Sequence, residues 1–357
     1  MPKTFPIKEP FSGSTVPEGW KFSGAAALVE GWLRLVPDKT FQTGTVLLDR
    51  AFSSKLGIRV EFDLAAYHDT GSEPPGDGIS FFLIDGAKTT GPGGPGGALG
   101  YAFYEKGTKP GVTAGYLGIG VDQFGSFSNP VEAGTGGPGQ KPNSMVVRGS
   151  GDGNNGFDYL TGADLPHDLS LTRQAPARVH LTILDGKVTA GFRPPGGVQK
   201  LIADFQIPHG TGQEPLPDTL KLGLSAATGG STSNYVVRNL VISLPLASSQ
   251  KLRSTAYQDG GKYAYPYEFT LTAGQADVRR WSFSFDVPQG ATVKKDSGAW
   301  YTVVQDGSNG VVEISSPDDE SHVVFANKSL SIDITVDYPD KNDTHNTVAN
   351  LLAQQNE

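Results

Sequence analysis

Hydrophobic and polar residues alternate at every second position in many short segments of this chain. Residues 58–63 and 281–287 show the pattern, and so do residues 179–183 and 188–192 on either side of Asp185-Gly186. In a strand, this alternation puts the apolar side chains on one face and the polar side chains on the other. It therefore predicts antiparallel sheets packed as sandwiches, with a hairpin at Asp185-Gly186. The chain has 47 glycines and 25 prolines among 357 residues, which disfavours a helix-rich fold.

The length exceeds that of one ordinary domain, and a polar segment divides the chain. Residues 247–256 follow the last strand-like run of the first part, so we expect them to be a linker. Residues 1–246 would form a large sandwich, residues 257–340 a smaller one of a size that suits an immunoglobulin-like fold, and residues 341–357 a polar tail. We expect separate cores, formed by Trp20, Trp32, Phe62, Phe81 and Phe82 in the first part and by Trp281, Phe283, Phe285 and Phe325 in the second.

Charge and residue usage exclude several classes of function. The formal net charge is −8 and there is no basic stretch, so a nucleic-acid partner is not expected. The absence of cysteine excludes disulfides, thiolate metal sites and cysteine nucleophiles. No segment approaches the roughly 18 apolar residues of a membrane span, and the first residues lack the apolar run of a signal peptide. We therefore expect no membrane insertion, and the sequence leaves the cellular location and any export route open.

Four segments of the first part share motifs with one known family. They are residues 76–82 (Gly-Asp-Gly-Ile-Ser-Phe-Phe), 96–100 (Gly-Gly-Ala-Leu-Gly), 118–127 (Gly-Ile-Gly-Val-Asp-Gln-Phe-Gly-Ser-Phe) and 222–229 (Leu-Gly-Leu-Ser-Ala-Ala-Thr-Gly). In this order they resemble the L-type lectins, the family of legume lectins and animal cargo lectins, and the third segment has a form seen in bacterial members. The resemblance implies an all-β, concanavalin-like jelly roll for residues 1–246 and a non-catalytic glycan-binding function.

The resemblance also implies a shallow sugar site in loops at one end of the sandwich. Asp77 would accept hydrogen bonds from sugar hydroxyls and would follow a cis peptide bond, while Gly97 would donate its backbone N–H. An aromatic ring would stack on the sugar, and either Phe124 or Phe127 is a candidate. The carbohydrate-binding residues implied in this way are Asp77, Gly97, Ser126, Gly229, Gly230 and Ser231.

Calcium in this family holds the binding loops together through oxygen ligands. Ser126 stands where the family has an Asn that bonds both calcium and sugar, and the second metal carboxylate has no direct counterpart. Gly120 replaces the Glu that holds the transition metal in legume lectins, so no manganese is expected. The positions that match or could substitute for calcium ligands are Asp122, Phe124, Ser126, Asn129 and Glu132.

Two other functions fit parts of the sequence. A lectin-fold adhesion or toxin-type interaction protein with a degenerate sugar site would explain the altered metal positions. A carbohydrate-active enzyme would need two carboxylates about 5–10 Å apart. In glycosidases of similar fold they often lie on one strand, but the corresponding residues 120–124 contain a single carboxylate, that of Asp122. Glycan binding favours a protein that is secreted or acts at a cell surface. The sequence indicates neither the sugar nor the oligomeric state.

The C-terminal part faintly resembles bacterial cellulose- and chitin-binding modules, at residues 281–285 (Trp-Ser-Phe-Ser-Phe) and 288–290 (Pro-Gln-Gly). It could bind a second glycan, dimerise or act as a spacer. Trp281 shares a strand face with Phe283 and Phe285, which favours core packing over sugar stacking. Trp300 and Tyr301 follow a loop, so we expect them to be exposed.

Overall fold

The computed structural model describes residues 5–69, 75–165, 171–195, 200–210, 212–294 and 298–356. Nearly all of its regular structure is β-strand, which confirms the predicted all-β class. The chain forms two compact units. The large unit contains Lys8–Ser54 and Val60–Val241, and the small unit contains Met1–Ile7, Lys55–Arg59 and Ile242–Glu357.

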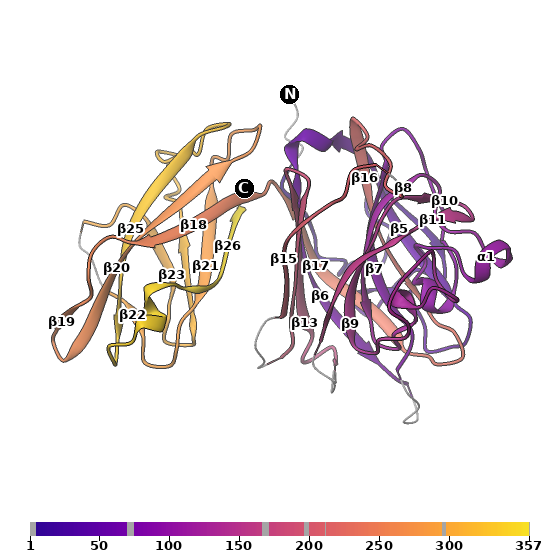
Figure 1. The fold of residues 1–357 in the computed structure, drawn as a ribbon, viewed down its shortest axis with the longest axis horizontal. Coiled ribbons are helices and arrows are strands. Elements are labelled where there is room, and N and C mark those ends of the chain that lie inside the picture. Colours follow the sequence, from indigo (N-terminus) through magenta and orange to yellow (C-terminus); the bar gives the residue numbers. More distant parts are fainter. Residues whose placement is uncertain are drawn as a thin grey trace. The chain divides into compact units, whose positions relative to one another are not determined.

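The first sheet of the large unit has eight strands within the described residues, in the order β15-β14-β13-β6-β17-β4-β3, with β1 beside β17 (Figure 1). Its hairpin between β13 and β14 turns at Asp185 and Gly186, which both have positive φ angles, so the predicted tight hairpin is confirmed. The strands are β1 (Ile7–Glu9), β3 (Ala27–Val29), β4 (Trp32–Val36), β6 (Ile58–Tyr67), β13 (Ala177–Leu184), β14 (Lys187–Arg193), β15 (Lys200–Gln206) and β17 (Asn234–Ser243).

The second sheet has nine strands in the described part of the chain, in the order β11-β10-β8-β7-β16-β5-β2, with β9 between β8 and β12. Strand β4 of the first sheet contacts β5 and β16 of the second, so the two sheets pack as a sandwich. The strands are β2 (Trp20–Gly24), β5 (Thr43–Ser53), β7 (Gly78–Asp85), β8 (Gly115–Asp122), β9 (Ser144–Arg148), β10 (Gly151–Asp152), β11 (Asn155–Gly156), β12 (Tyr159–Asp164) and β16 (Thr219–Ala227).

Short helical turns lie in the connections between strands. Their bounds are η1 (Ser54–Leu56), η2 (Gly96–Ala98), α1 (Glu105–Thr108), η3 (Ser126–Ser128) and η4 (Asp343–Asn346). Among the described residues, no helix is long and apolar enough to cross a membrane. The predicted core residues of the large unit are buried, namely Trp20, Trp32, Phe62, Phe81 and Phe82.

The small unit also contains two sheets in its described residues, with strand orders β18-β20-β25-β22, where β19 also pairs with β20, and β23-β24-β21-β26. The ring of Phe269 on β20 lies 4.9 Å from those of Phe283 and Phe285 on β21, which joins the sheets. The immunoglobulin-like topology stays a prediction. The strands are β18 (Leu246–Leu252), β19 (Tyr257–Asp259), β20 (Lys262–Ala273), β21 (Trp281–Asp286), β22 (Thr292–Val293), β23 (Thr302–Asp306), β24 (Val311–Ser315), β25 (Ser329–Tyr338) and β26 (Ala349–Gln355).

The structure corrects the predicted linker at 247–256 and the predicted polar tail at 341–357. Most of the first segment belongs to β18, which pairs with β20 from Leu246 to Leu252, and the second contains β26, which pairs with β21. Both strands lie at sheet edges, where exposed positions accept polar side chains, so polar composition did not exclude a strand. The compact units divide near Val241 and Ile242.

Aromatic residues of the small unit agree only partly with expectation. Trp281 is fully buried, as predicted, together with Phe283 and Phe285. Phe325 is 59% exposed, because it lies in a turn before β25, where strand alternation does not apply. Trp300 and Tyr301 are half-buried rather than exposed, since the Trp300 ring stacks on His322 with a centroid distance of 3.8 Å.

Candidate functional site

The predicted sugar-binding residues converge at one end of the second sheet. Antiparallel pairing places Gly78, which begins β7, opposite both Asp122 at the end of β8 and Ala227 at the end of β16. Asp77, immediately before β7, therefore lies beside the loops that follow the other two strands. The sequence motifs that are far apart in the chain meet because these three strands are neighbours.

Close backbone approaches complete the cluster. A Cβ atom added to Gly97 would lie 2.2 Å from the Cβ of Ser126, and one added to Gly76 would lie 2.5 Å from the Cβ of Ser231. At Gly229 the added atom would lie 3.0 Å from Oδ2 of Asp77. Glycine is therefore required at positions 76 and 97 for the present packing. Gly230 is exposed and has open space around its Cα.

Asp77 lies at the base of this cluster and is 4% exposed. It follows a cis peptide bond with Gly76, as the resemblance implied. Its backbone N–H donates to Ala227 O at 3.1 Å, and its carbonyl accepts from Gln123 N at 2.9 Å. The backbone of Gly229 donates to the carboxylate, but Oδ2 has no hydrogen-bond partner among the described residues. Burial raises the pKa of Asp77 to about 7, and the charge of Glu132 raises it too.

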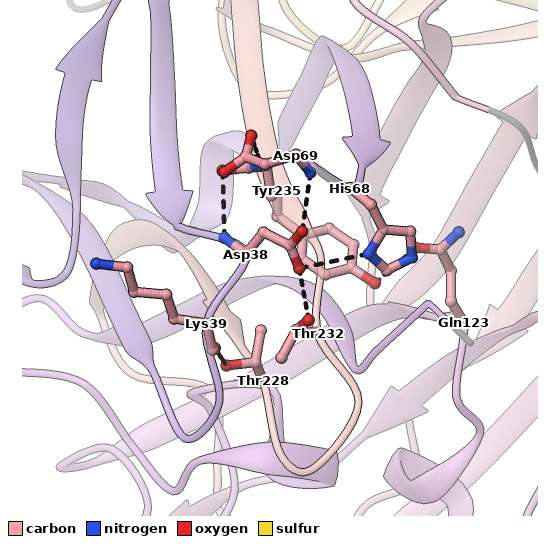
Figure 2. A network of polar contacts seen from close by, with 9 residues as sticks. Asp38, Lys39, His68, Asp69, Gln123, Thr228, Thr232 and Tyr235 are labelled. Atoms are coloured by element: carbon pink, nitrogen blue, oxygen red, sulfur yellow. Dashed lines mark hydrogen bonds and ion pairs between the residues drawn. The ribbon is translucent and has the colours of Figure 1, made fainter. Parts of the chain in front are cut away.

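A network of polar contacts anchors the loop 229–231 at both ends (Figure 2). On one side, the Thr228 hydroxyl donates to Lys39 O at 2.6 Å and accepts from Gln42 N at 2.9 Å. On the other side, the Thr232 hydroxyl donates to the Asp38 carboxylate. Although burial alone would raise it, hydrogen bonds from Thr232 and from the backbone of Asp69 keep the pKa of Asp38 below its usual value. The loop is thus tied to residues 38–42 on each side of its glycines.

The structure separates the two aromatic candidates and adds a third. Phe127 is fully buried in the core cluster that contains Leu99, so it cannot stack on a sugar. Phe124 is half-buried and stays a candidate. The third is Tyr104, which no sequence motif indicated; it is half-buried and has a ring carbon 3.5 Å from the Cβ position of Gly96. Its position shortly after the Gly-Gly-Ala-Leu-Gly motif is the signal that could have indicated it.

Asp122 serves as a loop support in this structure. It is fully buried, and its two carboxylate oxygens accept the backbone N–H groups of Gly125 and Phe127, both at 2.7 Å. Burial raises the pKa of Asp122 to about 8, against the opposing effect of these hydrogen bonds. Both oxygens of this candidate calcium ligand therefore already accept hydrogen bonds from backbone amides at the start of η3.

The other predicted calcium ligands are also bonded within the protein. The carbonyl of Phe124 accepts from Gln140 Nε2 at 3.1 Å, and the side-chain amide of Asn129 donates to Glu132 Oε1 at 3.3 Å. Ser126 Oγ alone of the predicted ligand atoms is buried without a partner in the described residues. In the same part of the chain, no cluster of three or more His, Asp or Glu side chains is arranged to hold a metal ion. The residues present therefore do not fit calcium.

Comparisons with known proteins give one family match and a group of similar solved structures. Residues 3–97 match the model of the legume-like lectin family. One similar solved structure is the lectin of Bauhinia forficata in complex with GalNAc, with 16% identity and a TM-score of 0.45, covering 67% of this chain and 96% of that chain. Another is basic winged bean lectin with Tn-antigen, with 18% identity and a TM-score of 0.49, covering 67% of this chain and 98% of that chain. The exoplasmic/lumenal domain of VIP36 in its Ca²⁺/Man3GlcNAc-bound form is also similar, with 16% identity and a TM-score of 0.45, covering 66% of this chain and 86% of that chain.

No curated protein matches the chain. The family match includes both Asp77 and Gly97, which lie in the first two of the four motifs. It confirms the resemblance on which the fold prediction rested, and residues 3–97 are accordingly similar to the legume-like lectin family.

Proposed function

We propose that the large unit is a non-catalytic glycan-binding module that recognises sugar hydroxyls through the loops around Asp77. The observation that carries this proposal is the buried Oδ2 of Asp77, which has no partner among the described residues and lies beside Gly229. An unpaired buried acceptor costs free energy, and a sugar hydroxyl supplies the missing donor. Ser126 Oγ, also buried without a described partner, adds a second unsatisfied polar atom.

Access to the carboxylate requires the loop 229–231 to move. Asp77 Oδ2 is buried and Gly229 lies beside it, so we expect a hydroxyl to reach this oxygen only after the loop shifts outward. Gly229 and Gly230 give the loop the backbone freedom for such a shift. Thr228 and Thr232 keep the ends of the loop in place while the centre moves.

The burial of Asp122 weighs against the enzymatic alternative. A glycosidase needs two carboxylates that can reach the glycosidic bond, one of them as acid and the other as base or nucleophile. Asp122 neighbours Asp77 in the fold, but it is fully buried with both oxygens bonded to backbone amides. It cannot take the second catalytic role without dismantling the loop that it supports.

A glycan array probed with the full-length protein tests the proposal. The array should include GalNAc-terminated and mannose-rich glycans, and it should be run once with CaCl₂ and once with EDTA. We expect binding to a defined group of glycans under both conditions. Binding to none would favour the interaction protein with a degenerate site, and release of free sugar from any of them would favour an enzyme.

The pH dependence of binding follows from the raised pKa of Asp77. The ionised carboxylate accepts two hydroxyl hydrogen bonds, so binding favours the ionised form and releases the bound proton. With the pKa near 7, the affinity should be highest above pH 8 and should fall by up to about tenfold for each pH unit below 7. Calorimetric titration of a glycan identified on the array, at pH 8, 7 and 6, measures this.

Protonation of Asp77 should affect the stability of the fold in the opposite direction to the glycan affinity, and this difference provides the control. Because the folded pKa of Asp77 lies above its unfolded value, protonation of Asp77 stabilises the folded state as the pH falls from 7 towards 4. Loss of affinity at pH 6 should therefore occur without any loss of melting temperature from this group. A wild-type affinity that is flat between pH 8 and 6 would contradict the role given to Asp77.

A further inference from the structure

Arg148 is a fully buried arginine beside the sugar-site loops. It is the last residue of β9, and its Nε donates to Phe127 O at 2.6 Å. Its two terminal nitrogens donate to Thr135 O at 3.0 Å, Phe157 O at 2.7 Å and Gly136 O at 3.3 Å. One guanidinium thus collects four main-chain carbonyls from three separate segments of the chain.

Arg148 and Asp122 hold the same loop residue from opposite sides. The backbone N–H of Phe127 donates to Asp122 Oδ2, its carbonyl accepts from Arg148 Nε, and its ring lies 5.3 Å from the guanidinium carbon. The preceding residue, Ser126, packs against Gly97 in η2. The positions of η3 and of the Gly97 loop are therefore set by a buried cation and a buried carboxylate.

We propose that the guanidinium of Arg148, together with Asp122, organises residues 123–136 in place of a metal ion. A metal ion would gather carbonyl and carboxylate oxygens from separate loops around one positive charge. Arg148 gathers carbonyls in this way, while the Asp122 carboxylate is already occupied by backbone amides. The loops next to the sugar site are then preformed in the protein alone, without calcium.

The shape of the side chain accounts for the choice of arginine. A guanidinium is planar and offers five N–H donors in a fixed arrangement, whereas a lysine ammonium offers three donors from one atom. The four carbonyls around Arg148 are reached by three different nitrogens. A lysine at this position would keep the charge but could not bond the three segments together.

The wild-type protein gives the first test, and it needs no sugar, so it can fail independently of the proposed function. We expect that neither millimolar CaCl₂ nor EDTA changes the melting temperature, and that EDTA leaves hydrogen exchange of the amides in residues 123–136 unchanged. Binding of calcium to the folded state would raise the melting temperature in proportion to the logarithm of the calcium concentration. Such a rise, or faster exchange of these amides in EDTA, would overturn the proposal.

Two variants give the second test. In Arg148→Lys and Arg148→Met, amides of residues 123–136 should exchange at least about tenfold faster than in the wild type, while amides of the small unit stay unchanged. Arg50→Lys, at an exposed position of β5, is the matched control and should behave as the wild type. Wild-type exchange rates in Arg148→Met would overturn the proposal. If neither Arg148 variant folds, the wild-type response to CaCl₂ and EDTA decides.

Discussion

Asp77→Ala is expected to lower the glycan affinity by about 30- to 1,000-fold, because losing a charged acceptor that bonds two hydroxyls costs about 2–4 kcal/mol. The fold should persist, since the bonds of residue 77 to Ala227 and Gln123 come from its backbone. The variant also removes a buried carboxylate that lacks a full set of partners. Titration calorimetry measures the affinity, and circular dichroism and thermal melting check the fold.

Asp85→Ala provides the matched control for this experiment. Asp85 ends the same strand, β7, at the opposite end from Asp77, and its carboxylate accepts from Ala87 N at 2.9 Å. Its replacement should leave glycan affinity within error of the wild type. If Asp77→Ala binds the glycan as tightly as Asp85→Ala does, the site residues carried over from the family are wrong for this chain.

Trp281→Ala should destabilise the small unit by about 3–5 kcal/mol, since it removes a large, fully buried side chain and leaves a cavity. The indole N–H of Trp281 donates to His322 O at 2.9 Å, and its ring packs edge-on against Trp300. Glycan affinity should stay unchanged below the melting temperature of the small unit, because we place the sugar site in the large unit. Chemical denaturation and glycan titration of the same preparation measure both quantities.

This point substitution tests separate folding better than truncation, because the small unit also includes Met1–Ile7 and Lys55–Arg59. Phe325→Ala is the control, since an exposed aromatic should contribute no more than about 0.5 kcal/mol. Loss of glycan binding in Trp281→Ala at temperatures where the large unit is folded would place the glycan site in the small unit, near Trp300 and Tyr301.

Features encoded by neighbouring residues could be predicted from the sequence. The alternation at 58–63 lies within β6, and Asp185-Gly186 forms the turn of a hairpin, because both signals are local. The motifs around Asp77 and Gly97 were recognisable as sequence strings, and the structure brings them to one end of a sheet. The edge strands β18 and β26 were not predicted, because the polar residues of an edge strand resemble those of a linker or a tail.

Arg148 shows most clearly what the sequence could not provide. An arginine at the end of a strand has no local signature, and its carbonyl partners lie at positions 127, 135, 136 and 157. The same limit explains the calcium ligands. The resemblance matched Asp122 by residue type, whereas its bonding to Gly125 and Phe127 depends on how the loop folds back.

The loop 229–231 lies beside the buried Asp77 carboxylate, and this arrangement affects the kinetics expected for glycan binding. Gly229 donates to the Asp77 carboxylate while its carbonyl accepts from Phe41 N at 3.1 Å, so uncovering Oδ2 breaks existing hydrogen bonds before a sugar can form new ones. If glycans bind here as proposed, we expect association in two steps, with an observed rate that reaches a plateau at high glycan concentration, set by the opening rate of the loop. If the loop 229–231 closes again over a bound sugar, dissociation also requires the loop to open. The complex would then dissociate more slowly than a complex of the same affinity at an open site.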